Sequence, residues 1–169
     1  MRPVSAIRVA PLQRPSQVNP LAENHQQAVR YASLFRRLMA IVYDLFLLIA
    51  LLFIATAVAM IATNGEAIEP GQAIYPFYLL YLLAISFVFF GWFWTHGGQT
   101  LGLKTWKIRV QQENGQPITW TLALIRFVTA VASWSAIGLG YLWALFDPKK
   151  RSWHDIASRC VLVDLRPDG

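Results

Sequence analysis

Groups that usually carry catalysis or bind metals are scarce in this sequence. A single cysteine, Cys160, excludes an intrachain disulfide and leaves no thiolate cluster for a metal ion. The three histidines, His25, His96 and His154, lie too far apart in the chain for the short ligand spacing of zinc sites. No nucleophile lies beside a convincing base at a matched depth in an apolar segment. We therefore expect neither a cofactor nor enzymatic activity.

Charge is also scarce: charged residues make up 14% of the chain, and hydrophobic residues make up 56%. The apolar residues form long blocks instead of amphipathic stripes, which predicts an integral membrane protein of one domain. The net charge of +6 could indicate nucleic acid, but the basic residues flank the apolar blocks and indicate membrane topology. We expect a bilayer with anionic headgroups as the partner and no nucleic acid. Residues 1–29, polar and basic, are predicted to form a mobile cytoplasmic arm.

Two apolar blocks are long enough to cross a bilayer as helices. They predict spans over about residues 36–62 and 74–95. Six arginines precede Leu38, whereas the connection between the spans contains Glu66 and Glu69 and no Lys or Arg. By the positive-inside rule, the N-terminus is cytoplasmic and this connection lies outside.

The third apolar block, residues 120–146, conflicts with a simple crossing. It is too short for two full spans of about 20 residues each. A single crossing would place the basic residues of the C-terminal segment outside, against the positive-inside rule. We therefore predict two short helices, over about residues 120–134 and 137–146, with a cytoplasmic C-terminus. They would form a re-entrant hairpin, or an in-plane helix followed by a shallow one.

Between the second and third blocks, the pattern changes to an alternation. Apolar and basic residues alternate from Trp106 to Val110, and an Asn-Gly pair at residues 114–115 is typical of a hairpin turn. Residues 103–118 therefore predict a strand or hairpin. A short strand-like run at residues 160–164 cannot stand alone, so we expect it to pair with this strand on the cytoplasmic side.

Charges of opposite sign lie in the first predicted span. Arg37 and Asp44 are seven residues apart and so only about 20° apart around the helix, with Ala40 between them. Arg126 lies on a face of small and hydroxyl-bearing residues that favours helix packing, so we expect it to point toward Asp44. Three roles fit: an ion pair that fixes packing, a gated ion or proton site at Asp44, or an anionic ligand held by the arginines.

Further motifs follow the second and third blocks. His154 and Asp155 are adjacent, and adjacent side chains on a strand or loop rarely converge on one substrate. We expect local hydrogen bonds and lipid-headgroup contact from them. Asp147, followed by a proline, is predicted to end the preceding helix. The glycine-rich segment 97–105 lacks the lysine position of a phosphate-binding loop and is expected to permit a tight exit from the second span.

In order and spacing, these motifs resemble the RDD family of small bacterial membrane proteins, which is named for one arginine and two aspartates. The resemblance extends over about residues 30–165. It identifies Arg37 as the family's arginine and Asp44 as its first aspartate; the second aspartate matches Asp155, beside His154, or Asp147 instead. The other positions that match family motifs are Ala40, Gly98, Gln99, Thr100, Gly102 and Arg126.

The resemblance implies a multi-pass protein of the bacterial inner membrane, for which transport of unidentified ligands has been suggested. Two departures are visible: Leu103 where Lys or Met is common, and Arg159-Cys160 in place of a Gly-Thr pair. The predicted fold is all-α, with two full transmembrane helices, a broken or re-entrant third apolar region and a small cytoplasmic β element. We expect a non-enzymatic assembly or partner-binding role for the ion pair. The alternative is proton-coupled cation or small-ligand transport by a homo-oligomer through Asp44.

Overall fold

The computed structural model describes residues 30–136 and 138–166. The predicted arm over residues 1–29 lies outside the described residues. The elements follow along the chain in this order: α2 Leu34–Ala62, α3 Tyr75–Thr95, α4 Leu101–Thr105, β1 Ile108–Gln112, α5 Trp120–Ser135, α6 Leu139–Leu142, the 3-10 helix η1 Trp143–Leu145, α7 Trp153–Ala157 and β2 Cys160–Asp164. The described chain is thus mostly helical, with one small sheet.

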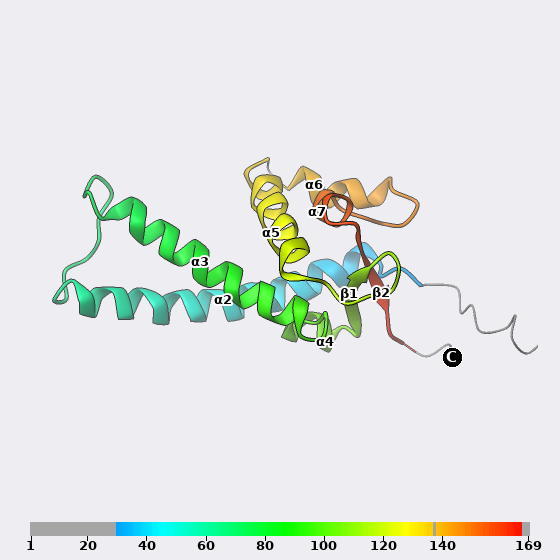
Figure 1. The fold of residues 1–169 in the computed structure, drawn as a ribbon, viewed down its shortest axis with the longest axis horizontal. Coiled ribbons are helices and arrows are strands. Elements are labelled where there is room, and N and C mark those ends of the chain that lie inside the picture. Colours follow the sequence, from blue (N-terminus) through cyan, green and yellow to red (C-terminus); the bar gives the residue numbers. More distant parts are fainter. Residues whose placement is uncertain (1–29, 137, 167–169) are drawn as a thin grey trace, which may run out of the picture.

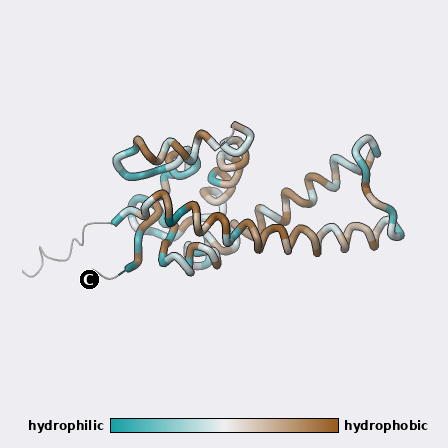
Figure 2. Tube along the Cα trace, turned by 180° about the vertical axis from the view of Figure 1, so that it is seen from behind, coloured by the Kyte–Doolittle hydropathy of each residue, from teal (hydrophilic) through white to brown (hydrophobic). Residues whose placement is uncertain are grey.

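Helices α2 and α3 run side by side and form the long part of the molecule (Figure 1). They contain 29 and 21 residues, and both are long and apolar enough to cross a membrane. Figure 2 shows hydrophobic residues along both helices and hydrophilic residues in the loop that joins them. Large apolar side chains such as Phe53 and Phe77 point outward, with 73% and 71% of their surface exposed. The prediction of two apolar helices of membrane-spanning length is confirmed, and α2 begins two residues before its predicted start.

The third apolar block is broken, as its sequence predicts. Helix α5 ends at Ser135, and the following α6–η1 segment is bent away from it by 110°. Gly138 lies at the break with a φ of +75°, a conformation that glycine adopts readily. Gly140 then packs against Ser133, where a side chain on residue 140 would overlap the serine hydroxyl. The second helix begins at Leu139, slightly later than predicted, with Gly138 as its N-cap.

The sheet has two antiparallel strands from distant parts of the sequence. β1 pairs with β2 in the register that places Val110 opposite Leu162. The chain just before α2 extends this sheet: Tyr31 forms a bridge to Val163, and the Ala32 amide donates to the Leu162 carbonyl at 2.9 Å. The predicted pairing of the C-terminal strand is therefore confirmed.

Residues 103–118 differ in part from the prediction of a strand or hairpin. A turn does form, with the Gly115 amide donating to the Gln112 carbonyl at 2.9 Å, but β1 pairs with β2 and not with a returning strand. Residues before the strand form α4, because the Thr100 side chain caps this helix by accepting from the Leu103 amide. The strand consequently begins at Ile108 and not at Trp106.

The core lies at the end of the molecule where the sheet, α4, α5 and α7 gather around the first turns of α2 (Figure 1). Ile108 and Val110 are buried on one face of β1, whereas Arg109 between them is exposed. Trp94 at the end of α3 and Phe127 of α5 join the same cluster. This packing brings the beginning of α2, the middle of α5 and the C-terminal segment together.

Candidate functional site

Asp155 is the centre of a buried network of charges. Its side chain is fully buried, and each carboxylate oxygen accepts a hydrogen bond from a different arginine. Arg37 Nη1 donates to Oδ2 at 3.0 Å, and Arg126 Nη1 donates to Oδ1. The two arginine residues are themselves only 5% and 4% exposed. One carboxylate on α7 therefore joins α2 to α5.

Local structure explains why Asp155 is held so rigidly. Ser152 is the N-cap of α7, and Asp155 lies three residues later in a capping box. The Ser152 amide and hydroxyl both donate to Oδ2 of Asp155, at 3.0 and 2.7 Å. The predicted local hydrogen bonding is confirmed. The predicted lipid-headgroup contact is wrong for this carboxylate, because Asp155 is fully buried. The segment is a short capped helix and not the expected strand or loop.

The electrostatics of α7 follow from burial and from the two guanidinium groups. Burial by itself would raise the pKa of Asp155, but the positive charges of Arg126 and Arg37 hold it well below its usual range. Burial lowers the pKa of His154 from 6.5 to about 3, so this ring is neutral at pH 7. His154 Nε2 lies 3.0 Å from the Ser152 hydroxyl, which itself donates to Asp155. The network therefore assigns the ring proton to Nε2.

The predicted ion pair between Arg37 and Asp44 is wrong, as is the expectation that Arg126 points toward Asp44. Arg37 is committed to Asp155 and to the Ala32 carbonyl, to which its Nε donates at 3.1 Å. No ion pair of Asp44 occurs within residues 30–136 and 138–166. Two turns of helix separate the Arg37 and Asp44 backbones by about 10 Å, so a carboxylate presented directly by α7 is the nearer partner.

Asp44 binds α4 instead. It accepts hydrogen bonds from the Thr100 hydroxyl and from the Gly102 amide, the latter at 2.8 Å. Gly102 packs so closely that a side chain there would overlap the Ala40 carbonyl and the Asp44 carboxylate. The glycine-rich segment thus clasps the first helix through its backbone. A threonine just before a helix is a sequence signal of an N-cap, as Thr100 is for α4. The sequence alone does not show that Asp44 binds this cap.

The rest of the glycine-rich segment is bound to β1. The Gly98 carbonyl accepts from the Val110 amide at 2.7 Å, and the Gln99 side chain donates to the Ile108 carbonyl at 2.8 Å. Gly98 has a φ of +71° and lies against the backbone of Val110, where a larger residue would clash. The junction of α2, α4 and β1 therefore brings together part of the predicted family-motif positions, namely Ala40, Gly98, Gln99, Thr100 and Gly102.

Asp147 lies in a separate, more exposed cluster. Its Oδ1 accepts from Arg151 Nη2 at 3.0 Å, and Arg151 also binds Glu113, next to the turn after β1. Within the described residues, Asp155 and not Asp147 is the aspartate that contacts Arg37 and Arg126. Asp147 does follow the end of η1, which confirms its predicted place after the helix. Among residues 30–136 and 138–166, no group of three His, Cys, Asp or Glu side chains could hold a metal ion.

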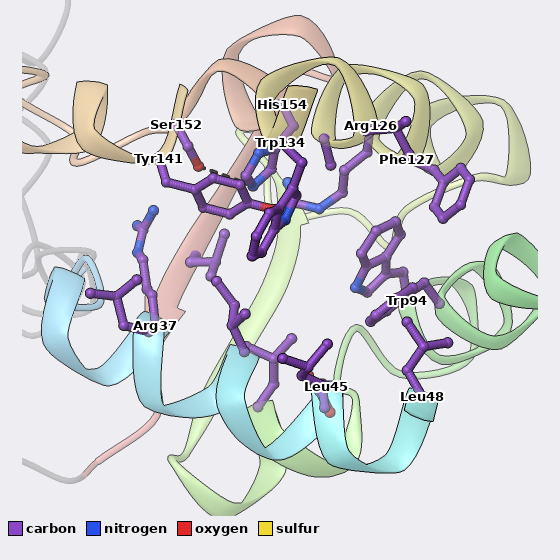
Figure 3. Close-up of a pocket in the computed structure, with 18 of the residues that line it drawn as sticks. Arg37, Leu45, Leu48, Trp94, Arg126, Phe127, Trp134, Tyr141, Ser152 and His154 are labelled. Atoms are coloured by element: carbon purple, nitrogen blue, oxygen red, sulfur yellow. Dashed lines mark hydrogen bonds between the residues drawn. The ribbon is translucent and has the colours of Figure 1, made fainter. Parts of the chain in front are cut away.

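A cavity of about 370 Å³ lies beside the network, between α2, α3 and α5. Figure 3 shows Arg37 and Arg126 on opposite sides of it, with Tyr141, Ser152 and His154 near them and Leu48 toward the other end. The Arg126 guanidinium also lies over the Trp94 ring, 5.1 Å from its centroid. Asp44 lines this cavity too. The arrangement can hold a charged or amphiphilic molecule. Ser152 and His154 also line the cavity, but the Ser152 hydroxyl donates to Asp155 and faces the protonated Nε2 of His154, so this ring is not placed to take the serine proton.

Comparison with known proteins bears on the identity of this fold. No curated protein and no solved structure matches the chain. The model of the RDD family matches residues 31–159, which cover both long helices, the glycine-rich segment, α5 and α7. Because this match extends over well more than half of the 169 residues, the chain belongs to the RDD family.

Proposed function

We propose that this chain is a non-enzymatic, multi-pass protein of the bacterial inner membrane that serves as an assembly or partner-binding module. Helices α2 and α3 would cross the bilayer, and the sheet would lie on the cytoplasmic side with both termini. The excess of arginines before α2 and the two glutamates between the helices support this orientation.

The observation that carries the proposal is the double ion pair of Asp155. It ties the C-terminal segment to the first turn of α2 and to the middle of α5. Loss of one partner from a buried ion pair leaves a charge without compensation. The network would therefore fix the arrangement of the helices and the surface that they present to a partner or to a second copy of the chain.

A double-mutant cycle tests this role. Asp155→Asn should lower the free energy of unfolding by about 3–5 kcal/mol, because two arginines lose their carboxylate. Arg37→Met and the double variant complete the cycle, with an expected coupling of about 1–3 kcal/mol. Denaturant unfolding in a neutral detergent gives the energies, and light scattering of the same samples gives the oligomeric state. An Asp155→Asn protein as stable and as assembled as wild type would contradict the proposal.

Proton-coupled cation or small-ligand transport through Asp44 is the second candidate function. It is favoured by one observation, that Asp44 lines the cavity between α2, α3 and α5. Both of its oxygens, however, already accept hydrogen bonds from α4. Ion flux into proteoliposomes under an imposed pH gradient tests this candidate. Flux in wild type that is lost in a monodisperse Asp44→Asn protein would establish transport, and no flux in either would exclude it.

A further inference from the structure

One end of the cavity has more hydrogen-bond donors than the protein uses. Arg37 and Arg126 both line it, and two guanidinium groups share the one carboxylate of Asp155. Arg37 Nη2 and Arg126 Nε are buried and have no hydrogen-bond partner among the described residues. Buried donors without acceptors cost free energy. Both side chains also line the cavity, so their positive charge favours an anion at this end of it.

Asp44 also lines the cavity, but it does not supply these donors with an acceptor. Its two oxygens face Thr100 and Gly102 of the glycine-rich segment, and it forms no ion pair within the described chain. Two other titratable side chains line the cavity near the arginines. His154 is neutral at pH 7, and Tyr141 is a phenol that is neutral well below an ordinary pKa of about 10. The arginine end of the cavity therefore keeps a positive charge in excess of Asp155.

The opposite end of the cavity is apolar and opens sideways. Leu45 and Leu48 of α2 line it together with Leu83 of α3. From Arg37 to Leu48 the helix rises by about 16 Å, so the cationic and apolar ends are well separated. Leu45 and Trp134 line the cavity and are still 42% and 60% exposed, so it opens between α2 and α5 (Figure 3).

We propose that this cavity binds an anionic phospholipid. The phosphate would lie at the cavity end that Arg37 and Arg126 line, and one acyl chain would follow α2 toward Leu48. Guanidinium groups bind phosphate oxygens by charge-assisted hydrogen bonds, and the sideways opening faces the bilayer core if α2 and α3 span it. A small soluble anion would leave the apolar end empty. This inference rests on the membrane insertion proposed above.

Native mass spectrometry of the full chain in a neutral detergent tests the inference. The protein is mixed with equal amounts of dioleoyl-phosphatidylglycerol and dioleoyl-phosphatidylcholine, and the bound lipid is identified. Retention of one phosphatidylglycerol, preferred by about tenfold or more, is expected from charge-assisted contacts to the phosphate region and a net positive site. Equal retention of both lipids overturns the inference. Displacement by inorganic phosphate at concentrations similar to those of the lipid assigns the site to a free anion and also overturns it.

Cavity-filling variants locate the site without touching the ion pairs. Ala130→Phe places a ring in the cavity, whereas Ala132→Phe on the same helix points to the exposed side. Leu45→Trp and Phe46→Trp form a second matched pair on α2. The first member of each pair should lose phosphatidylglycerol by about tenfold or more, and the second should retain it. If a cavity-filling variant keeps the wild-type melting temperature and also binds phosphatidylglycerol as well as wild type, the lipid does not bind in this cavity.

Two further variants separate this inference from its alternatives. Arg126→Lys keeps the positive charge toward Asp155 but replaces a planar guanidinium by a single ammonium, so it should fold and bind phosphatidylglycerol more weakly. Asp44→Asn should bind the lipid at least as well as wild type, because it removes a negative charge from the cavity lining. Loss of lipid binding by an Asp44→Asn protein that keeps the wild-type melting temperature would overturn the inference. If the wild-type protein is stable and shows the Asp155 coupling but has no lipid preference, this inference is wrong and the proposed assembly role still stands.

Discussion

Arg37 Nη1 donates a 3.0 Å hydrogen bond to Oδ2 of Asp155 across 118 positions of sequence. The same guanidinium donates through Nε to the Ala32 carbonyl, just where the chain leaves the sheet. One side chain therefore connects the beginning of α2, the edge of the sheet and the cap of α7.

Replacement of Arg37 by lysine should destabilise the fold although the charge is kept. Lysine can still reach one carboxylate oxygen, but it cannot also serve the Ala32 carbonyl with the geometry of a guanidinium. We expect a loss of about 1–3 kcal/mol in the free energy of unfolding for the buried group left without a donor. Arg109→Lys, at an exposed position of β1, is the control and should change little. Equal stability of both variants would contradict the two-sided role of Arg37.

The fold should become less stable as the pH falls below about 6.5. The pKa of His154 is about 3 in the folded protein because of burial, against 6.5 ordinarily, so the unfolded chain takes up this proton first. The contribution of His154 to the free energy of unfolding is complete above pH 6.5. It declines as the pH falls toward 3, by up to about 1.4 kcal/mol per pH unit. Asp155 behaves in the same direction but at lower pH, since its pKa is held below the usual 3.8.

Melting temperatures of wild type and His154→Gln across this pH range test the assignment. The variant should show a flatter dependence because the buried ring is gone. His96→Gln, at an exposed ring, should keep the wild-type slope. If His154→Gln keeps that slope as well, His154 is not the group responsible.

Addition of one methyl group at Gly102 should weaken the clasp between α4 and α2. An alanine side chain would meet the Ala40 carbonyl and the Asp44 carboxylate, and a backbone cannot move aside without cost. We expect a loss of about 1–3 kcal/mol, typical of overpacking. Leu101→Ala, at an exposed position of the same short helix, removes atoms without causing a clash and should cost less. Denaturant unfolding compares the two, and a neutral Gly102→Ala change would disprove the close contact.

Single cysteines should label from opposite sides of the membrane. Cys160, the native cysteine, is fully buried, so Glu66→Cys and Gln116→Cys each add one exposed thiol. A membrane-impermeant maleimide on cells with a permeabilised outer membrane should label position 66 at once and position 116 only after lysis, because the arginine-rich flank stays cytoplasmic. Labelling of both positions before lysis would contradict the proposed topology.

Much of the fold could be predicted from local patterns. Block lengths predicted α2 and α3, the glycines and the charge balance predicted the break after α5, and the need of β2 for a partner predicted its pairing with β1. The short helices α4 and α7 were missed, because one turn of helix has almost no periodicity to detect. Their caps, Thr100 and Ser152, were the available signals.

The sequence by itself determined that the chain has two membrane-length helices, that charges lie at their borders and which family motifs are present. Helical spacing correctly placed Arg37 and Asp44 on one stripe, but a shared stripe does not establish an ion pair. Tertiary structure alone decided that Arg37 binds Asp155 and that Asp44 binds α4. The physical reason is that a buried charge pairs with the group that the packed chain brings within hydrogen-bond distance, and that group came from a helix far away in the sequence.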